Sequence, residues 1–213
     1  MASINNSYEY YQSNQGLLNM LNSKKSGNAL IDQIISNNDL KFQKTMEKMG
    51  IGSSSSDGKF YSLSKSSNNL LNSIDALKNK SLYEGEDGKE YDKSDLIKKI
   101  SNFVTAYNSE VTSIDNCGGA LKNTFSNELT STYNVNKDLL DQVGITIDSS
   151  GKMSIDNDKI EQTETSKLQE IFGTDSTYMK ALAASADSIY GIVDKALSYA
   201  TTNYTSAGTM LGL

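Results

Sequence analysis

The hydrophobic positions follow a helical period along most of the chain. The strongest run lies between residues 97 and 114, where apolar residues recur at steps of three and four. This spacing keeps one stripe in register over about five turns and is typical of helices that pack along a seam. A second run of the same spacing, thinned by Ser185 and Ala196, lies between residues 178 and 199. We expect both stripes to be buried against other helices, in this chain or in a neighbour; their main residues are Ile97, Ile100, Val104, Tyr107, Val111 and Ile114, and Leu182, Ile189, Ile192 and Tyr199.

Weaker periodic segments predict the other helices. They cover residues 8–21, 27–50, 60–78, 120–141 and 158–172, and the last long helix is expected to end near residue 202. Asp92 is placed to cap the helix that carries the first seam, because its carboxylate can accept from the free amides of the first turn. The short connection through Gly118 and Gly119 predicts that the helices on either side are antiparallel neighbours.

One stretch breaks the helical pattern. Residues 143–156, VGITIDSSGKMSID, alternate apolar and polar positions around a turn sequence, which predicts a β-hairpin. Gly151 is placed to take the left-handed position that closes the loop. Because a two-stranded hairpin is marginal alone, its apolar face should lie on the helical bundle; that face consists of Val143, Ile145, Ile147, Met153 and Ile155. A turn sequence at 81–92 predicts a loop or a second short hairpin.

These elements predict a mainly α protein, an elongated antiparallel helical bundle with one or two small β-hairpins. We divide the chain into an N-terminal helical segment (1–50), a Ser/Gly linker (51–59), a bundle with its hairpin (60–205) and a flexible tail (206–213). The chain has no Pro, so the strongest helix breaker is missing.

Composition and charge limit the kinds of partner that the protein is expected to bind. The net charge is −6, and all 20 basic residues are Lys. The chain therefore lacks the planar guanidinium group that reads guanine edges and clamps phosphate, and we expect no nucleic-acid partner. No segment approaches the ~18 apolar residues that span a bilayer, and the N-terminus lacks the pattern of a cleaved signal peptide. We expect no membrane insertion, and either a cytoplasmic protein or one exported without a cleaved signal.

The sequence contains few candidate catalytic or metal-binding residues. The absence of His removes the usual nucleophile–base pairs and the imidazole metal ligands. Residues 144–153 depart from a phosphate-binding loop in glycine spacing and end in Met153, and calcium loops starting at Asp87 or Asp148 have Lys at their twelfth positions. Glu161 and Glu164 lie one turn apart without an aromatic platform and are interpreted as a solvated helix face. The lone Cys117 is interpreted as a small apolar residue in a loop. We predict no enzyme activity, no cofactor and no metal.

Three motifs carry a resemblance to a known family. FVTAYNSEVTSI (103–114) is followed by LLDQVGITIDSSGKMSID (139–156) and then by LQEIFG (168–173). In this order and spacing they resemble the C-terminal part of flagellar hook-associated protein 2, the filament-capping protein. The residues that match the family are Phe103, Val104, Tyr107 and Asn108 in the first motif, Gly144, Ile145, Thr146, Asp148, Gly151, Met153, Ser154, Ile155 and Asp156 in the second, and Phe172 in the third.

The resemblance implies a bacterial, non-enzymatic structural protein with a helical stalk. It implies self-association or contact with flagellar axial proteins, and a location outside the cell after export through the flagellar channel. The chain departs from the family pattern because its N-terminal motif and large β-rich insert are missing, so a stand-alone stalk-like protein fits better than a complete cap. The alternative is a secreted or cytoplasmic helical binding module, or an effector, that uses this fold away from flagella.

Overall fold

The computed structural model describes residues 54–85 and 91–209, and the description below is confined to them. The predicted segments 8–21 and 27–50 lie outside this part of the chain. In order along the chain, the elements are α3 (Ser54–Leu77), the 3₁₀ turn η1 (Lys80–Leu82), α4 (Ser94–Cys117), α5 (Gly119–Gln142), β1 (Ile145–Ile147), β2 (Met153–Ile155), α6 (Asn157–Gln162), α7 (Thr165–Phe172) and α8 (Thr177–Thr209).

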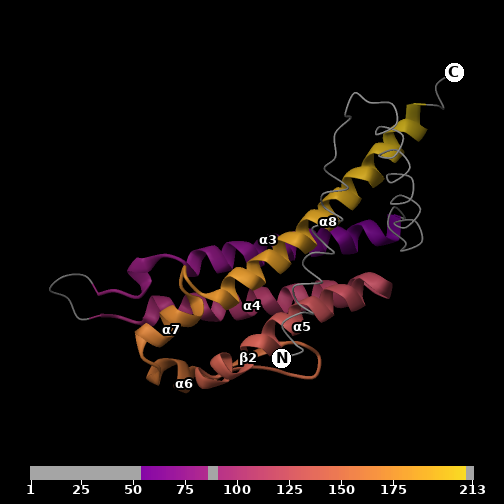
Figure 1. Ribbon diagram of the computed structural model, residues 1–213. Helices are drawn as coiled ribbons and strands as arrows, with labels where there is room; N and C mark the ends of the chain where they lie inside the picture. Colours follow the sequence, from indigo (N-terminus) through magenta and orange to yellow (C-terminus); the bar gives the residue numbers. More distant parts are fainter. Residues whose placement is uncertain (1–53, 86–90, 210–213) are drawn as a thin grey trace, which may run out of the picture.

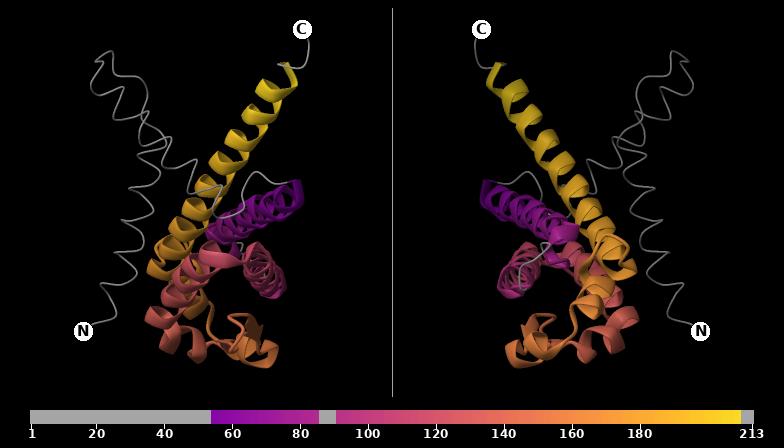
Figure 2. Two further views of the ribbon diagram at one scale, coloured as in Figure 1. Left: turned by 90° about the vertical axis from the view of Figure 1, so that its right-hand side faces the viewer. Right: turned by 90° about the vertical axis from the view of Figure 1, so that its left-hand side faces the viewer.

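The four long helices form one bundle. Helix α3 packs against both α4 and α8, and α5 also packs against both of them. Figures 1 and 2 show α3 and α4 side by side, with α8 crossing them and continuing past their ends. Neighbouring helices run in opposite directions, as the short connection through Gly118 predicts for α4 and α5. The prediction of a mainly α fold with a small β-hairpin is confirmed.

The two predicted seams lie in the core of this bundle. Ile100, Val104, Tyr107, Val111 and Ile114 of α4 are at most 6% exposed, and Ile97 is partly buried against the same core. On α8, Leu182, Ile189 and Ile192 are buried with the small residues Ser185 and Ala196. The structure does not describe the side chain of Tyr199. A single chain therefore buries these stripes itself, with apolar residues of α3, α5 and α7 opposite them.

The β-hairpin forms at the predicted place. Strand β1 pairs with β2 in antiparallel register, with Ile145 opposite Ile155 and Ile147 opposite Met153. Gly151 has a φ of +81°, the left-handed conformation predicted for it. Ile145 and Met153 are buried, and Ile147 and Ile155 pack on the edge of the core. The strands lie against α5 and α4, so the predicted placement of the apolar face on the bundle is confirmed.

Several boundaries differ from the sequence prediction. Helix α3 begins at Ser54, so the prediction of a linker is wrong for residues 54–59. Helix α8 continues to Thr209, so the predicted tail is helical over residues 206–209, and residues 210–213 lie outside the description. The turn near 81–92 contains η1, and no strand forms in its described residues.

The predicted helix at 158–172 is two helices, α6 and α7. The break has a tertiary cause: Lys93 Nζ donates to the carbonyl oxygens of Ile160 (3.1 Å), Glu161 (2.8 Å) and Thr163. These carbonyls are at the end of α6: Ile160 O also accepts from the C-cap amide of Thr163 at 3.3 Å, whereas Glu161 O and Thr163 O lie beyond the last amides of the helix. Thr163 takes an extended conformation, with φ −71° and ψ 135°, and the chain turns into α7.

Candidate functional site

Helix α4 carries the polar contacts that organise the molecule, so its surroundings form the candidate functional site. At its start, Asp92 Oδ1 accepts from Ser94 N at 2.8 Å, so the predicted acceptor contacts the first turn, although the N-cap residue itself is Lys93. This backbone hydrogen bond also lowers the pKa of the Asp92 carboxyl. Farther along α4, Asn108 holds the hairpin and Glu110 contacts α3.

Asn108 binds the backbone of β2 through both ends of its side-chain amide. Its Nδ2 donates to Met153 O at 2.8 Å, and its Oδ1 accepts from Met153 N at 2.7 Å. The amide thus occupies the place that a third strand would take along the outer edge of β2. This contact connects two of the three motifs of the family resemblance, because Asn108 belongs to the first and Met153 to the second.

Glu110 is a fully buried acid between α4 and α3. It is 0% exposed, and its two carboxyl oxygens lie 2.5 Å from Ser66 Oγ and 2.7 Å from Ser67 Oγ. Both serine hydroxyls also lie 3.0 Å from Leu63 O. No ion pair to Glu110 is found among the described residues.

Counting protons favours the neutral form of Glu110. The two serines have two hydroxyl protons for four close contacts, two to the carboxyl group and two to Leu63 O. A protonated carboxyl group supplies a third proton and can donate to Ser66 Oγ, which leaves the Ser66 hydroxyl free to donate to Leu63 O. Burial acts in the same direction and raises the pKa of Glu110 to about 7, although the two serine hydrogen bonds oppose the rise.

Cys117 ends α4 on the same face and is partly buried. Burial raises the pKa of its thiol to about 11, and the nearby Glu110 adds to this, while Lys59 opposes it. A raised thiol pKa leaves little thiolate at neutral pH, so Cys117 lacks the activation that a nucleophilic cysteine needs. It packs against the core, as the sequence suggests, but at the end of a helix.

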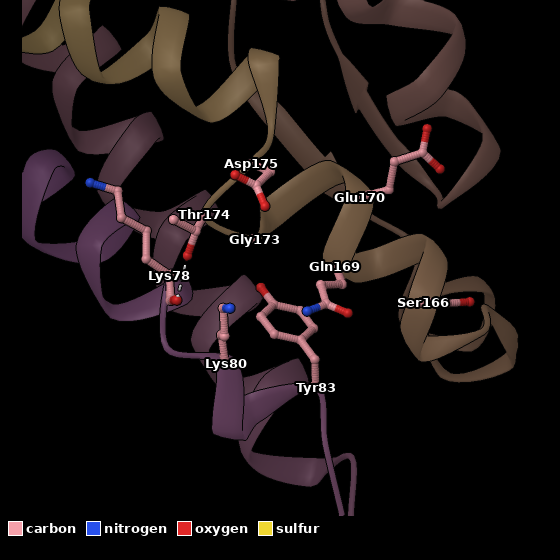
Figure 3. Close-up of a pocket in the computed structure, with 9 residues that line it drawn as sticks. All are labelled: Lys78, Lys80, Tyr83, Ser166, Gln169, Glu170, Gly173, Thr174 and Asp175. Atoms are coloured by element: carbon pink, nitrogen blue, oxygen red, sulfur yellow. Dashed lines mark hydrogen bonds between the residues drawn. The ribbon is translucent and has the colours of Figure 1, made fainter.

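A polar pocket of about 280 Å³ lies where α3 and η1 meet α7 and the start of α8 (Figure 3). Its charged groups have both signs, with Lys78 and Lys80 on one side and Glu170 and Asp175 on the other. Glu170 pairs with Lys167 at 2.8 Å, and the Asp175 side chain is fully exposed. Thr174 Oγ1 donates to Lys78 O at 2.8 Å and joins the two sides. These contacts are those of a solvated junction between helices.

A second hollow of about 330 Å³ lies between α4, α5 and the hairpin loop. Its apolar lining includes Val111, Ile114 and Leu129, and the ion pair of Asp115 with Lys122 (3.2 Å) lies beside it. Gly151 of the loop is close to Val111, since a Cβ at this glycine would lie 3.8 Å from Val111 Cγ1. The hollow has an apolar floor with a polar rim.

The rest of the described chain adds no chemical group to these features. Over residues 54–85 and 91–209, no cluster of three or more His, Cys, Asp or Glu is placed to hold a metal ion. None of the helices in the same part of the chain has the length and apolar character needed to cross a bilayer. Glu161 and Glu164 are the carboxylate pair considered in the sequence. Glu161 is on α6 and Glu164 follows that helix, and both side chains are exposed.

The fold therefore defines a class, a mainly α bundle with one hairpin held by a helix. Comparison with family models, with curated proteins and with solved structures finds no match to this chain.

Sequence reasoning missed the roles of Asn108 and Glu110. A signal for Glu110 is present, because Leu96, Phe103, Glu110 and Cys117 are each seven residues apart and share one face of α4. Ser67 occupies the equivalent slot between Phe60 and Ile74 in α3. For Asn108, the periodic pattern contains no signal, since the partner is the backbone of a strand 45 residues away.

Proposed function

We propose that this protein is a non-enzymatic structural protein that works by helix–helix association. The observation that carries the proposal is the length of α8. It has 33 residues, whereas α3, α4 and α5 have 24 each. At a rise of 1.5 Å per residue, the nine extra residues add about 14 Å. Figure 1 shows the yellow end of α8 continuing beyond the other three helices.

The end of α8 is suited to contact with another molecule. Ala196 is the last buried residue among the α8 side chains that the structure describes, and thirteen residues follow it in the helix. In proteins most helical stability comes from the packing of one helix face, so this end of α8 would gain stability from a packing partner. A second copy of the chain, or an axial protein of a filament, would supply that partner.

The flagellar setting is the finer part of the proposal. The resemblance to the stalk of filament-capping proteins supports it through residues 103–114 and 139–173. The contact of Asn108 with Met153 supports it further, because it gives the two motifs a shared structural role. Under this proposal the protein is located outside the cell, on or near the flagellum.

Two experiments test the proposal at its two levels. Light scattering across a concentration series should show association of the full chain, while a variant that lacks residues 199–213 should remain folded and monomeric. Deletion of residues 210–213 alone is the matched control and should leave association intact. A full chain that stays monomeric at high concentration and binds no axial protein would contradict the proposal. For the location, antibody detection in sheared filaments and culture supernatant should be positive, and detection confined to the cytoplasm would contradict it.

The alternative is a helical binding module that uses this fold away from flagella. The hollow between α4, α5 and the hairpin loop favours it, because its apolar floor and polar rim fit one side chain of a protein partner. A Thr130→Lys variant would place a charge at the half-buried rim of this hollow without burying it in the core. Loss of partner binding by this variant, with association through α8 intact, would favour the alternative.

A further inference from the structure

The contact of α3 with α4 contains one ionisable group at its centre. Glu110 of α4 is fully buried, and its only hydrogen-bond partners among the described residues are Ser66 and Ser67 of α3. We propose that the neutral Glu110 carboxyl group latches α3 to α4, and that loss of its proton opens this contact. The latch would be closed in mildly acidic conditions and weakened above neutral pH.

Over residues 54–85 and 91–209, no basic side chain forms an ion pair with Glu110. On α3, the nearby basic residue is Lys59, which lies close enough to influence Cys117 at the end of α4. On α4, the neighbouring ionisable side chains of the core are Cys117 and Tyr107, and burial raises the pKa of both. On α8, the buried ionisable residue is Tyr178, whose pKa burial raises well above 10. On α5, the buried ionisable residues are Glu128 and Tyr133.

Ionisation removes what holds the contact together. The carboxylate can no longer donate to Ser66 Oγ, so both serines must divide their protons between the charge and Leu63 O. The charge is also fully buried without an ion-pair partner among the described residues, which favours any opening that admits water. Because the hydrogen-bond partners belong to α3, the opening is expected there and not at the hairpin, which Asn108 holds on another face of α4.

The direction of the pH effect follows from proton linkage. The pKa of Glu110 is about 7 in the closed bundle and takes the ordinary value of 4.5 when water reaches the group. The closed state therefore binds more protons between these values, and opening becomes more favourable as the pH rises through this range. Above about pH 8 both states are ionised, and the effect levels off. From pH 5 to pH 8 the opening equilibrium should increase on the order of 100-fold.

Hydrogen–deuterium exchange of the full chain, corrected for intrinsic rates, measures this opening. Peptides from α3 should lose protection between pH 5 and pH 8 by that factor, while peptides from the hairpin change much less. The pKa values of Asp141 and Asp148, next to and within the hairpin, are lowered by their hydrogen bonds, so both stay ionised over this range and add no pH dependence to the hairpin. Unchanged α3 protection, or equal loss in the hairpin, would overturn the latch.

Three variants assign the effect to Glu110. Glu110→Gln should abolish the pH dependence in α3, and Glu128→Gln, the matched control at another buried carboxyl group, should preserve it. Ser67→Ala removes a hydrogen bond that lowers the Glu110 pKa, so the loss of protection should level off at a higher pH. The proposal is wrong if Glu110→Gln keeps the wild-type pH dependence, or if the loss of protection in Ser67→Ala levels off at the same pH as in the wild type. The exchange readout is independent of association through α8, which separates this test from that of the proposed function.

Discussion

Replacing Asn108 by Ala tests whether α4 holds the hairpin through one side chain. The variant removes two hydrogen bonds of 2.7 and 2.8 Å to the backbone of Met153. A hydrogen bond contributes about 0.5–1.5 kcal/mol net, and a buried group left without a partner costs about 1–3 kcal/mol. Met153 is 4% exposed, so water replaces the lost partners poorly. We expect a loss of about 2 kcal/mol in the free energy of unfolding.

The measurement needs a correction, because Ala is a better helix former than Asn by up to about 0.7 kcal/mol. Asn102 lies in the interior of the same helix and is exposed, so Asn102→Ala provides the matched control. The difference between the two variants in urea unfolding, followed by circular dichroism, isolates the contact with β2. A difference below about 0.5 kcal/mol would refute the reasoning, since it would mean that the hairpin is held by its apolar face alone.

A second substitution at the same position separates the two hydrogen bonds. Asn108→Asp keeps the acceptor for Met153 N and removes the donor to Met153 O. At neutral pH the variant should be destabilised, because the carboxylate then faces a carbonyl oxygen. At a pH low enough to protonate it, the acid regains a donor, and the difference from the wild type should shrink. A difference that is independent of pH would contradict this assignment.

Three further substitutions test the hairpin and the break between α6 and α7. Ile145→Asp buries a charge at a position that is 0% exposed and should lower the free energy of chemical unfolding by several kcal/mol. The control Thr146→Asp, at the exposed neighbour, should lower it by less than about 1 kcal/mol. Gly151→Ala should lower the free energy of unfolding by about 1–2 kcal/mol, because Gly151 has a positive φ. Gly58 lies on a helix with open space around it, so Gly58→Ala should raise the free energy of unfolding by up to about 1 kcal/mol. Changes of the same sign in the two variants would contradict this. Lys93→Met removes the donor to three carbonyls and should raise hydrogen exchange in α6 selectively; uniform exchange across the chain would argue against that role.

The helices and the hairpin were predictable because each buries a periodic stripe. The six seam residues of α4 identify the helix and its buried face without any structure, and the alternation around Gly151 does the same for the hairpin. The direction of neighbouring helices also followed from one short connection through Gly118. In each case the information is local, since the period of the side chains and the chirality of the turn lie within a few residues.

The missed features depend on contacts between distant residues. The break after α6 is stabilised by Lys93, about 70 residues earlier in the chain, and the local sequence predicts one continuous helix. The last turns of α8 have polar and β-branched residues of low helix propensity, which led to an end predicted near residue 202 in place of Thr209. Asn108 was assigned to a motif by resemblance, but only the fold shows that its partner is Met153.

The buried polar residues Ser66 and Ser67 of α3 and Glu110 of α4 fix the register in which the two helices pack. Sliding α3 by seven residues would place Phe60 or Ile74 opposite Glu110 in place of Ser67. The apolar contacts would largely survive such a shift, because the same face of α3 is apolar one heptad away on either side. The carboxyl group would lose both serine hydroxyls, and an unsatisfied buried polar group costs several kcal/mol. Apolar packing therefore holds the helices together while distinguishing poorly between registers, and the pairing of Glu110 with Ser66 and Ser67 selects the observed one.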